Sequence, residues 1–126
     1  DGAGDADLAA HPHKKIKASA AKIDEYISKV SAYRAGGDGG KCLKILIIYV
    51  KNVADNPGED KFKRIKMDNK VYKTKVKPFI GAKALLLAVG FKPAEGGETA
   101  LVLSEDADQD LLTQTKQKLE AAFASY

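Results

Sequence analysis

Apolar residues recur at helical spacing along much of the chain. From His13 to Val30 they return every three or four positions, which predicts a helix with one apolar stripe. This stripe consists of Ile16, Ala20, Ile23, Ile27 and Val30. The segment from Lys41 to Pro57, KCLKILIIYVKNVADNP, is apolar nearly all round and predicts a buried central helix that ends at the Asn-Pro pair. The glycine-rich residues 35–40, AGGDGG, are expected to form a flexible loop between these helices.

Shorter patterns follow the central helix. The sequence GEDKF at 58–62 favours a turn or a single helical turn. Polar and apolar residues alternate in KRIKM at 63–67, which predicts a short strand. Asp68 is placed to cap a helix over residues 69–77, and Pro78 is expected to break that helix.

The last part of the chain combines helices with a hairpin. The sequence GAKALLLAVG at 81–90 predicts a short helix that its final glycine closes. The segments FKP and ETALVL, on either side of AEGG, predict a β-hairpin. A final helix is predicted over residues 106–125, with Asp106 as its cap and Gln109 three residues later. The apolar side of this helix is expected to carry Leu112, Leu119 and Phe123.

Together these elements predict an α+β fold that is mainly helical, a bundle of about five helices with a small two- or three-stranded antiparallel sheet. At 126 residues the chain is long enough for one ordinary domain. We expect this domain to span residues 13–126, after a flexible leader of small and polar residues at 1–12. Because the chain starts at Asp1 without a methionine, we expect it to be one domain of a longer protein.

The positive charge of the chain is concentrated in one segment. Residues 61–77, KFKRIKMDNKVYKTKVK, hold eight of the 21 basic residues and a single acid, Asp68. Residues 1–60 are balanced, with nine basic and nine acidic side chains, and residues 78–126 hold four and seven. The net charge of +4 therefore comes from a local patch, which indicates a partner for that patch.

Residues suited to catalysis or metal binding are scarce. His11 and His13, the two histidines, fall at the end of the expected leader and have no further Cys or His beside them. The single cysteine, Cys42, lies in the most apolar helix and is expected to be a buried, unreactive thiol. We therefore expect no enzyme, no metal and no cofactor. A chain without a possible internal disulfide suits a reducing compartment, so the cytoplasm or the nucleus is expected.

Two local motifs do not match the phosphate-binding or calcium-binding loops that they resemble. AGGDGGKC at 35–42 has Ala35 where a phosphate-binding P-loop needs its first glycine, and Cys42 where it needs a hydroxyl. The acids in SEDADQD at 104–110 lack the glycine and the bidentate glutamate of a calcium loop, and read instead as a helix N-terminus. The longest apolar run, ILIIYV, has six residues, which is too short to span a membrane.

The basic segment leaves alternatives open. A helix and a hairpin beside eight cations could form a winged-helix-like nucleic-acid binder, although Glu95 and Glu98 would serve a wing poorly. Alternatively, Lys70, Lys73 and Lys77 form a solvated helix face. Neither alternative accounts for the apolar residues inside the basic segment, or for a tyrosine and an asparagine spaced three apart on the central helix.

A family resemblance accounts for these residues. The sequence ILIIYVKNVADNPGEDKFKRIKMDNKVYKTKVKPFIGAKALLLAVGF resembles the PUB (PUG) domain of peptide N-glycanase, UBX-domain adaptors and a linear-ubiquitin ligase. The pattern is Y-x-x-N on a helix, then N-P, an aromatic residue, a basic-apolar strand that ends in Asn, and finally G-A and G-F. The likeness is close over residues 40–104 and looser over the final helix, 106–125.

This resemblance implies a non-catalytic peptide-binding adaptor with a small antiparallel sheet. The implied partner is the C-terminal tail of valosin-containing protein, a hexameric AAA ATPase, whose tail carries acids followed by leucine and tyrosine. Similar short motifs in other proteins are further candidates, and the implied pathways are ubiquitin-dependent and ER-associated degradation. We expect a monomer that binds neither membrane nor nucleic acid. The winged-helix-like nucleic-acid binder remains the alternative.

The resemblance also implies a set of site residues. These are Tyr49, Asn52, Phe62, Ile65, Lys66 and Asn69. In the family pattern the tyrosine and the first asparagine line the tail pocket, the strand lysine meets the acids of the tail, and the second asparagine holds peptide main chain. The aromatic and the isoleucine belong either to the pocket or to the core beneath it. Two positions depart from the pattern: Asp68 could repel an acidic tail or merely cap the helix, and Lys61 stands where some members have an aromatic residue.

Overall fold

The computed structural model describes the backbone of residues 12–96 and 99–126, and side chains from Ala20 onward within these ranges. The predicted leader at residues 1–12, which includes His11, lies outside the described residues except for Pro12. Pro12 is the first residue of a helix. The described residues form five α-helices, two 3-10 turns and three strands. In chain order these are α2 (Pro12–Ser31), η1 (Ala35–Gly37), α3 (Asp38–Asp55), η2 (Asp60–Phe62), β1 (Arg64–Lys66), α4 (Lys70–Lys75), α5 (Ala82–Ala88), β2 (Phe91–Pro93), β3 (Ala100–Leu103) and α6 (Gln109–Ser125).

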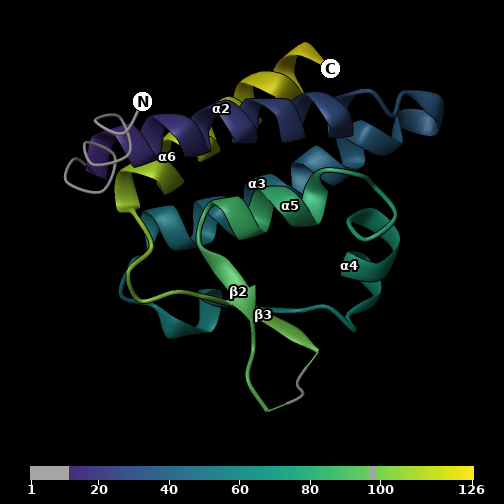
Figure 1. The fold of residues 1–126 in the computed structure, drawn as a ribbon. Coiled ribbons are helices and arrows are strands. Elements are labelled where there is room, and N and C mark those ends of the chain that lie inside the picture. Colours follow the sequence, from purple (N-terminus) through teal and green to yellow (C-terminus); the bar gives the residue numbers. More distant parts are fainter. Residues whose placement is uncertain (1–11, 97–98) are drawn as a thin grey trace.

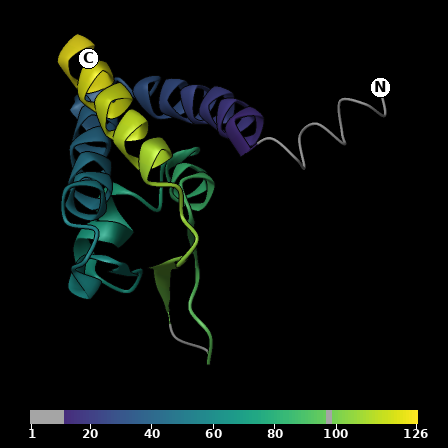
Figure 2. The ribbon, with the colours of Figure 1, turned by 90° about the vertical axis from the view of Figure 1, so that its left-hand side faces the viewer.

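The helix α3 lies at the centre of the helical part, and the small sheet lies at the end of the molecule opposite α2 and α6 (Figure 1). Figure 1 shows α2 and α6 at one end, strands β2 and β3 at the opposite end, and α3 and α5 between them. In the perpendicular view of Figure 2, α6 crosses in front of α3. The contacts agree, because α3 touches each of the other four α-helices. The predicted α+β, mainly helical fold is therefore confirmed, and the predicted central helix is present but is buried on only part of its surface.

The sheet is antiparallel throughout, with the strand order β1-β3-β2. Ile65 pairs with Leu101, and Phe91 pairs with Leu103. All four side chains are buried on the face of the sheet that packs against the helices. Their neighbours alternate to the opposite face, as the twofold periodicity of a strand requires. The predicted hairpin and the predicted short strand are both present, and β1 joins the hairpin as an edge strand.

The prediction of a flexible loop at 35–40 is wrong in its second half. The helix α3 begins at Asp38, so Gly39 and Gly40 are helical. These glycines allow close packing: a Cβ on Gly39 would lie 2.4 Å from the Val30 carbonyl oxygen, and a Cβ on Gly40 would lie 2.8 Å from the Tyr126 ring. The run of glycines predicted a loop. In the structure two of these glycines are helical, and because they have no side chain, Tyr126 can pack on the helix.

Both predicted helix caps are off by one or two residues. Asn69, and not Asp68, is the N-cap of α4, because its side chain accepts a hydrogen bond from the Val71 amide. That helix ends at Lys75 and does not reach residue 77. The N-cap of α6 is Asp108, and not Asp106.

The beginning and one face of α6 also differ from expectation. Asp108 accepts a hydrogen bond from the Leu111 amide, while Asp106 accepts one from the Ser104 hydroxyl in the preceding turn. Two of the three residues predicted for the apolar side are buried. Leu112 and Leu119 are buried, but Phe123 is 43% exposed. Leu111 and Thr115 are the other buried residues of this helix.

The close approach at Gly39 yields a test of stability. We expect Gly39→Ala to lower the free energy of unfolding by at least about 2 kcal/mol, because its Cβ would press on two backbone carbonyls that cannot rotate away. The matched control is Gly58→Ala, since no atom lies within 4 Å of a Cβ at that position. Urea denaturation measures both variants. Equal stability of the two would contradict the packing described for the α2–α3 junction.

Candidate functional site

A groove of about 530 Å³ lies between α3 and the segment that follows it. The chain reverses after α3, so that η2, β1 and α4 run back along the helix and form the second wall. Three residues of α3 line one side of the groove: Ile45, Ile48 and Tyr49. The other side is lined by Lys61, Arg64, Ile65, Lys66, Asn69 and Val71.

The structure brings four of the six predicted site residues into this groove. Tyr49, Ile65, Lys66 and Asn69 line it, although they come from three different elements. Phe62 does not line the groove; it is half-buried and packs against the hydrophobic core. Asn52 does not line it either, and is half-buried one turn beyond Tyr49 on α3.

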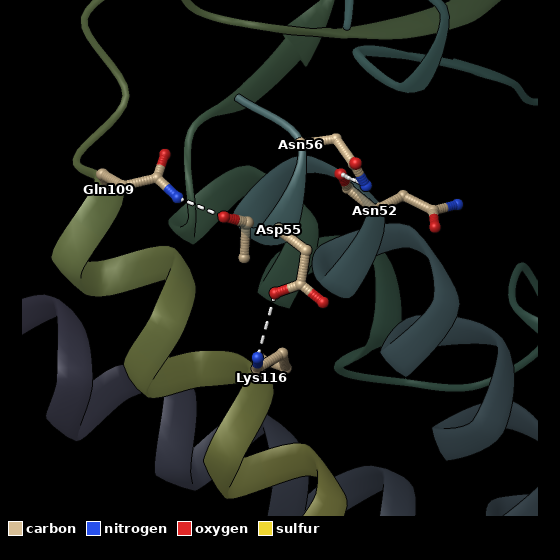
Figure 3. A network of polar contacts seen from close by, with 6 residues as sticks. Asn52, Asp55, Asn56, Gln109 and Lys116 are labelled. Carbon is tan, nitrogen blue, oxygen red and sulfur yellow. Dashed lines mark hydrogen bonds and ion pairs between the residues drawn. The ribbon is translucent and has the colours of Figure 1, made fainter. Parts of the chain in front are cut away.

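The polar contacts around Asn52 explain how this end of α3 is held. Figure 3 shows Gln109 of α6 donating to the Ala54 carbonyl and Lys116 paired with Asp55. The Asn52 carbonyl accepts from the Asn56 side chain at 3.1 Å. The bond from Gln109 satisfies the Ala54 carbonyl, which the helix end would otherwise leave without a partner. The Asn52 amide itself points away from the α6 side in Figure 3.

Sequence reasoning missed three apolar residues of the groove. Ile48 and Val71 are 44% and 43% exposed and line the same groove, with Ile45 half-buried beside them. A signal was present: the central helix is apolar nearly all round, whereas its contacts with other helices bury only part of its circumference. Apolar positions in excess of what the core needs indicate a second apolar surface.

Three cations lie along one wall of the groove, beside this apolar floor. Lys61, Arg64 and Lys66 line the groove, and no acidic residue lines it among the described part of the chain. The Lys61 ammonium also lies 5.1 Å from the centre of the Phe62 ring, within cation–π range. Apolar side chains beside charges of one sign favour a ligand that combines an apolar group with negative charge.

Burial suppresses ionisation beneath the groove. Desolvation raises the pKa of the Tyr49 hydroxyl, and the neighbouring Tyr72 and Cys42 raise it further. The same desolvation raises the pKa of the Cys42 thiol to about 12, and the side chain is fully buried. A thiol with that pKa is almost entirely protonated at neutral pH, so Cys42 packs in the core and does not act as a nucleophile.

Asn69 has two roles available to it at the groove. Its side-chain oxygen accepts from the Val71 amide at 2.8 Å and so caps α4. Its side-chain nitrogen has no hydrogen-bond acceptor among the described residues, and the residue is exposed at the rim. The cap therefore fixes the side-chain oxygen, and the amide nitrogen of this groove-lining residue remains available as a donor.

A larger hollow lies on the outer face of the sheet but is less suited to binding. It measures about 670 Å³, and its charged lining has both signs, Arg64 and Lys92 against Glu95, Glu105 and Asp106. Apolar residues such as Val102 and Leu103 also line this hollow, but its charges do not form a field of one sign. The groove beside α3 combines apolar residues with charges of one sign, so it is the stronger candidate although it is smaller.

The remaining basic residues match a solvated surface. Lys70, Lys73 and Lys77 are exposed on and beside α4. This helix has six residues, less than two turns, and so offers few side chains to a DNA groove. Among the described residues no group of three or more His, Cys, Asp or Glu is arranged to hold a metal, and no helix is long and apolar enough to cross a membrane.

Comparison with known proteins confirms the resemblance. The family model described as PUB domain matches residues 39–116, more than half of the chain. The chain is similar to UBX domain-containing protein 6 of Caenorhabditis elegans, with 38% identity over 71 residues, which is 56% of this chain and 16% of the relative. It is also similar to mouse UBX domain-containing protein 6, with 34% identity over 83 residues, 58% of this chain and 19% of the relative.

A second group of relatives consists of enzymes. The chain is 32% identical over 73 residues to human peptide-N(4)-(N-acetyl-beta-glucosaminyl)asparagine amidase, which is 58% of this chain and 11% of the amidase. The chain thus spans less than a fifth of the length of these relatives. The matched segment begins in the second residue of α3 and includes all residues that line the groove.

The cap role of Asn69 can be tested by stability. We expect Asn69→Ala to lower the free energy of unfolding by about 1 kcal/mol, since the Val71 amide loses its acceptor. Asn69→Ser keeps a capping oxygen and should change stability by only a few tenths of that amount. Chemical denaturation distinguishes the two. If the alanine and serine variants were equally stable, the side chain would not be the cap.

Proposed function

The chain belongs to the PUB domain family, and from this premise we propose that it is a non-catalytic peptide-binding domain. Its groove would take the acidic C-terminal tail of the AAA ATPase valosin-containing protein, or a similar short motif of acids followed by leucine and tyrosine. One observation carries the proposal: an apolar floor of α3 and β1 residues lies beside a wall with three cations. Through this tail the domain would link the ATPase to ubiquitin-dependent and ER-associated degradation, in the cytoplasm or nucleus.

The proposed contacts follow from the chemistry of the groove. A leucine or tyrosine of the tail would fill the apolar space between Ile48 and Val71, whose exposed surfaces would then be covered. Lys66 would meet an acid of the tail, and the free amide of Asn69 would donate to a main-chain carbonyl. Exposed ion pairs contribute only about 0–1 kcal/mol each, so most of the affinity comes from the apolar side chain. Such a small contact predicts micromolar affinity, on the order of −8 kcal/mol.

Asn52 and Phe62 stay within the proposed site as its neighbours. Asn52 is one turn beyond Tyr49 on α3, so a tail that continues along the helix would reach it. Phe62 lies below the Lys61 ammonium and supports that side chain from the core side. Their part would be to extend and brace the groove, while Tyr49 and Ile65 form its floor.

A titration compares this proposal with the nucleic-acid alternative. We expect a peptide that ends in acid-acid-Leu-Tyr-Gly to bind with micromolar affinity and to lose only a few-fold in affinity between low and moderate salt. A short DNA duplex should bind weakly at both salt concentrations. Fluorescence anisotropy measures both ligands. Tight duplex binding with a steep salt dependence, together with no peptide binding, would overturn the proposal.

Two isoleucines provide a matched pair of variants. Ile48→Asp should weaken the peptide at least tenfold, because it removes apolar floor and adds a charge that repels the tail. Ile80→Asp makes the same chemical change at a side chain that is 67% exposed and does not line the groove, so binding should stay within twofold. Calorimetric titration measures both. Equal losses would place the binding site away from the groove.

Two further variants of this experiment separate the rim from the distant basic surface. Asn69→Ser keeps the cap but lacks the amide donor, and should weaken the peptide by roughly 1–3 kcal/mol. Lys73→Ala lies on the exposed face of α4, away from the groove lining, and should matter little. A large loss with Lys73→Ala would mean that the patch binds as a diffuse electrostatic surface.

A further inference from the structure

Asp68 is the one acid in the basic segment 61–77, and the structure removes its simplest explanation. It stands between β1 and α4, where a cap for α4 would be expected, but Asn69 supplies that cap. The Asp68 side chain is exposed, and no hydrogen bond or ion pair joins it to another described residue. Its charge is therefore not needed by the helix that follows it.

The position of Asp68 brings its charge next to the groove. A hollow of about 240 Å³ is lined by Arg64, Lys66, Asp68, Thr99 and Ala100. Arg64 and Lys66 also line the groove, so the groove and the hollow adjoin across these two side chains. A ligand acid that meets Lys66 in the groove consequently has the Asp68 carboxylate as a neighbour on the other side of β1.

We propose that Asp68 is a specificity-determining residue of the groove, an inference that rests on the proposed function. Lys66 attracts one acid of the ligand, whereas Asp68 repels a second acid that reaches the adjoining hollow. A residue with an uncharged hydrogen-bond donor, such as asparagine, can instead donate to the Asp68 carboxylate. Asp68 therefore reduces the affinity that a second consecutive acid adds to the peptide, compared with a single acid flanked by an uncharged polar residue.

Screening bounds the size of this effect. All charges involved are at least partly exposed, so the interaction of one pair corresponds to a change of at most about fivefold in affinity at low salt. Salt near 1 M reduces the Debye length to about 3 Å and should abolish it. Hydrophobic contacts in the groove are unaffected by the substitution, which separates a change of selectivity from a general change of affinity.

Three synthetic peptides test the inference, ending in Asp-Asp-Leu-Tyr-Gly, Asn-Asp-Leu-Tyr-Gly and Asp-Asn-Leu-Tyr-Gly. Each is titrated against the unaltered domain, Asp68→Asn and Asp60→Asn. Asp60 is the charge-matched control, because it is exposed, lies on the adjacent turn and pairs with Lys63 away from the groove lining. We expect Asp68→Asn to strengthen the two-acid peptide about three- to fivefold at low salt. At least one single-acid peptide should change by less than twofold, and the gain should vanish near 1 M salt.

The outcomes separate this inference from its premise. Equal gains for all three peptides, no gain for the two-acid peptide, or the same gain with Asp60→Asn would overturn the role of Asp68 and leave the groove as the binding site. Failure of every peptide to bind any form of the domain would overturn the proposed function and the inference together. Thermal unfolding of Asp68→Asn should match the unaltered domain, because the Asn69 cap is retained.

Discussion

The antiparallel packing of α6 along α3 is the contact on which the rest of the structure depends. At one end Tyr126 packs its ring on Gly40, and its hydroxyl donates to the Tyr33 carbonyl. At the other end Gln109 donates to the Ala54 carbonyl, and Lys116 pairs with Asp55. The helix α3 is thus fixed at both ends from one side. Its other side is free to form the groove wall, with Ile48 left exposed because no helix covers it.

The same division explains what the sequence could and could not predict. Periodicity identifies α2, α3 and α6, and alternation identifies the short strands, because these patterns arise from each element facing one core. Phe123 follows the helical period yet is 43% exposed, whereas Ala122 and Tyr126 beside it pack against the core. The prediction of a loop at Gly39 and Gly40 was wrong for a different reason. The role of these glycines is set by Val30 and Tyr126, which come close to them only in the folded structure.

The groove shows a further difference between residue identity and residue position. The family pattern implied six site residues, and four of them, Tyr49, Ile65, Lys66 and Asn69, line one groove. Pattern alone could not separate Asp68 from Asn69 as the cap, because both residue types are good caps and only backbone geometry chooses between them. Nor could it reveal Val71, which lies outside the central helix, since an exposed and a buried aliphatic residue look alike in a sequence.

The edge position of β1 gives its cations a second consequence. This strand has β3 on one side only, so the other side of a short strand is open to pairing with another chain. Arg64 and Lys66 stand on that strand, and cations on an edge strand oppose edge-to-edge association of two copies, since their charges repel. The residues that would recognise an acidic partner are thus also those that discourage self-association. An acidic ligand would complement the positive charge of this strand, whereas a second copy of the strand would bring like charges together.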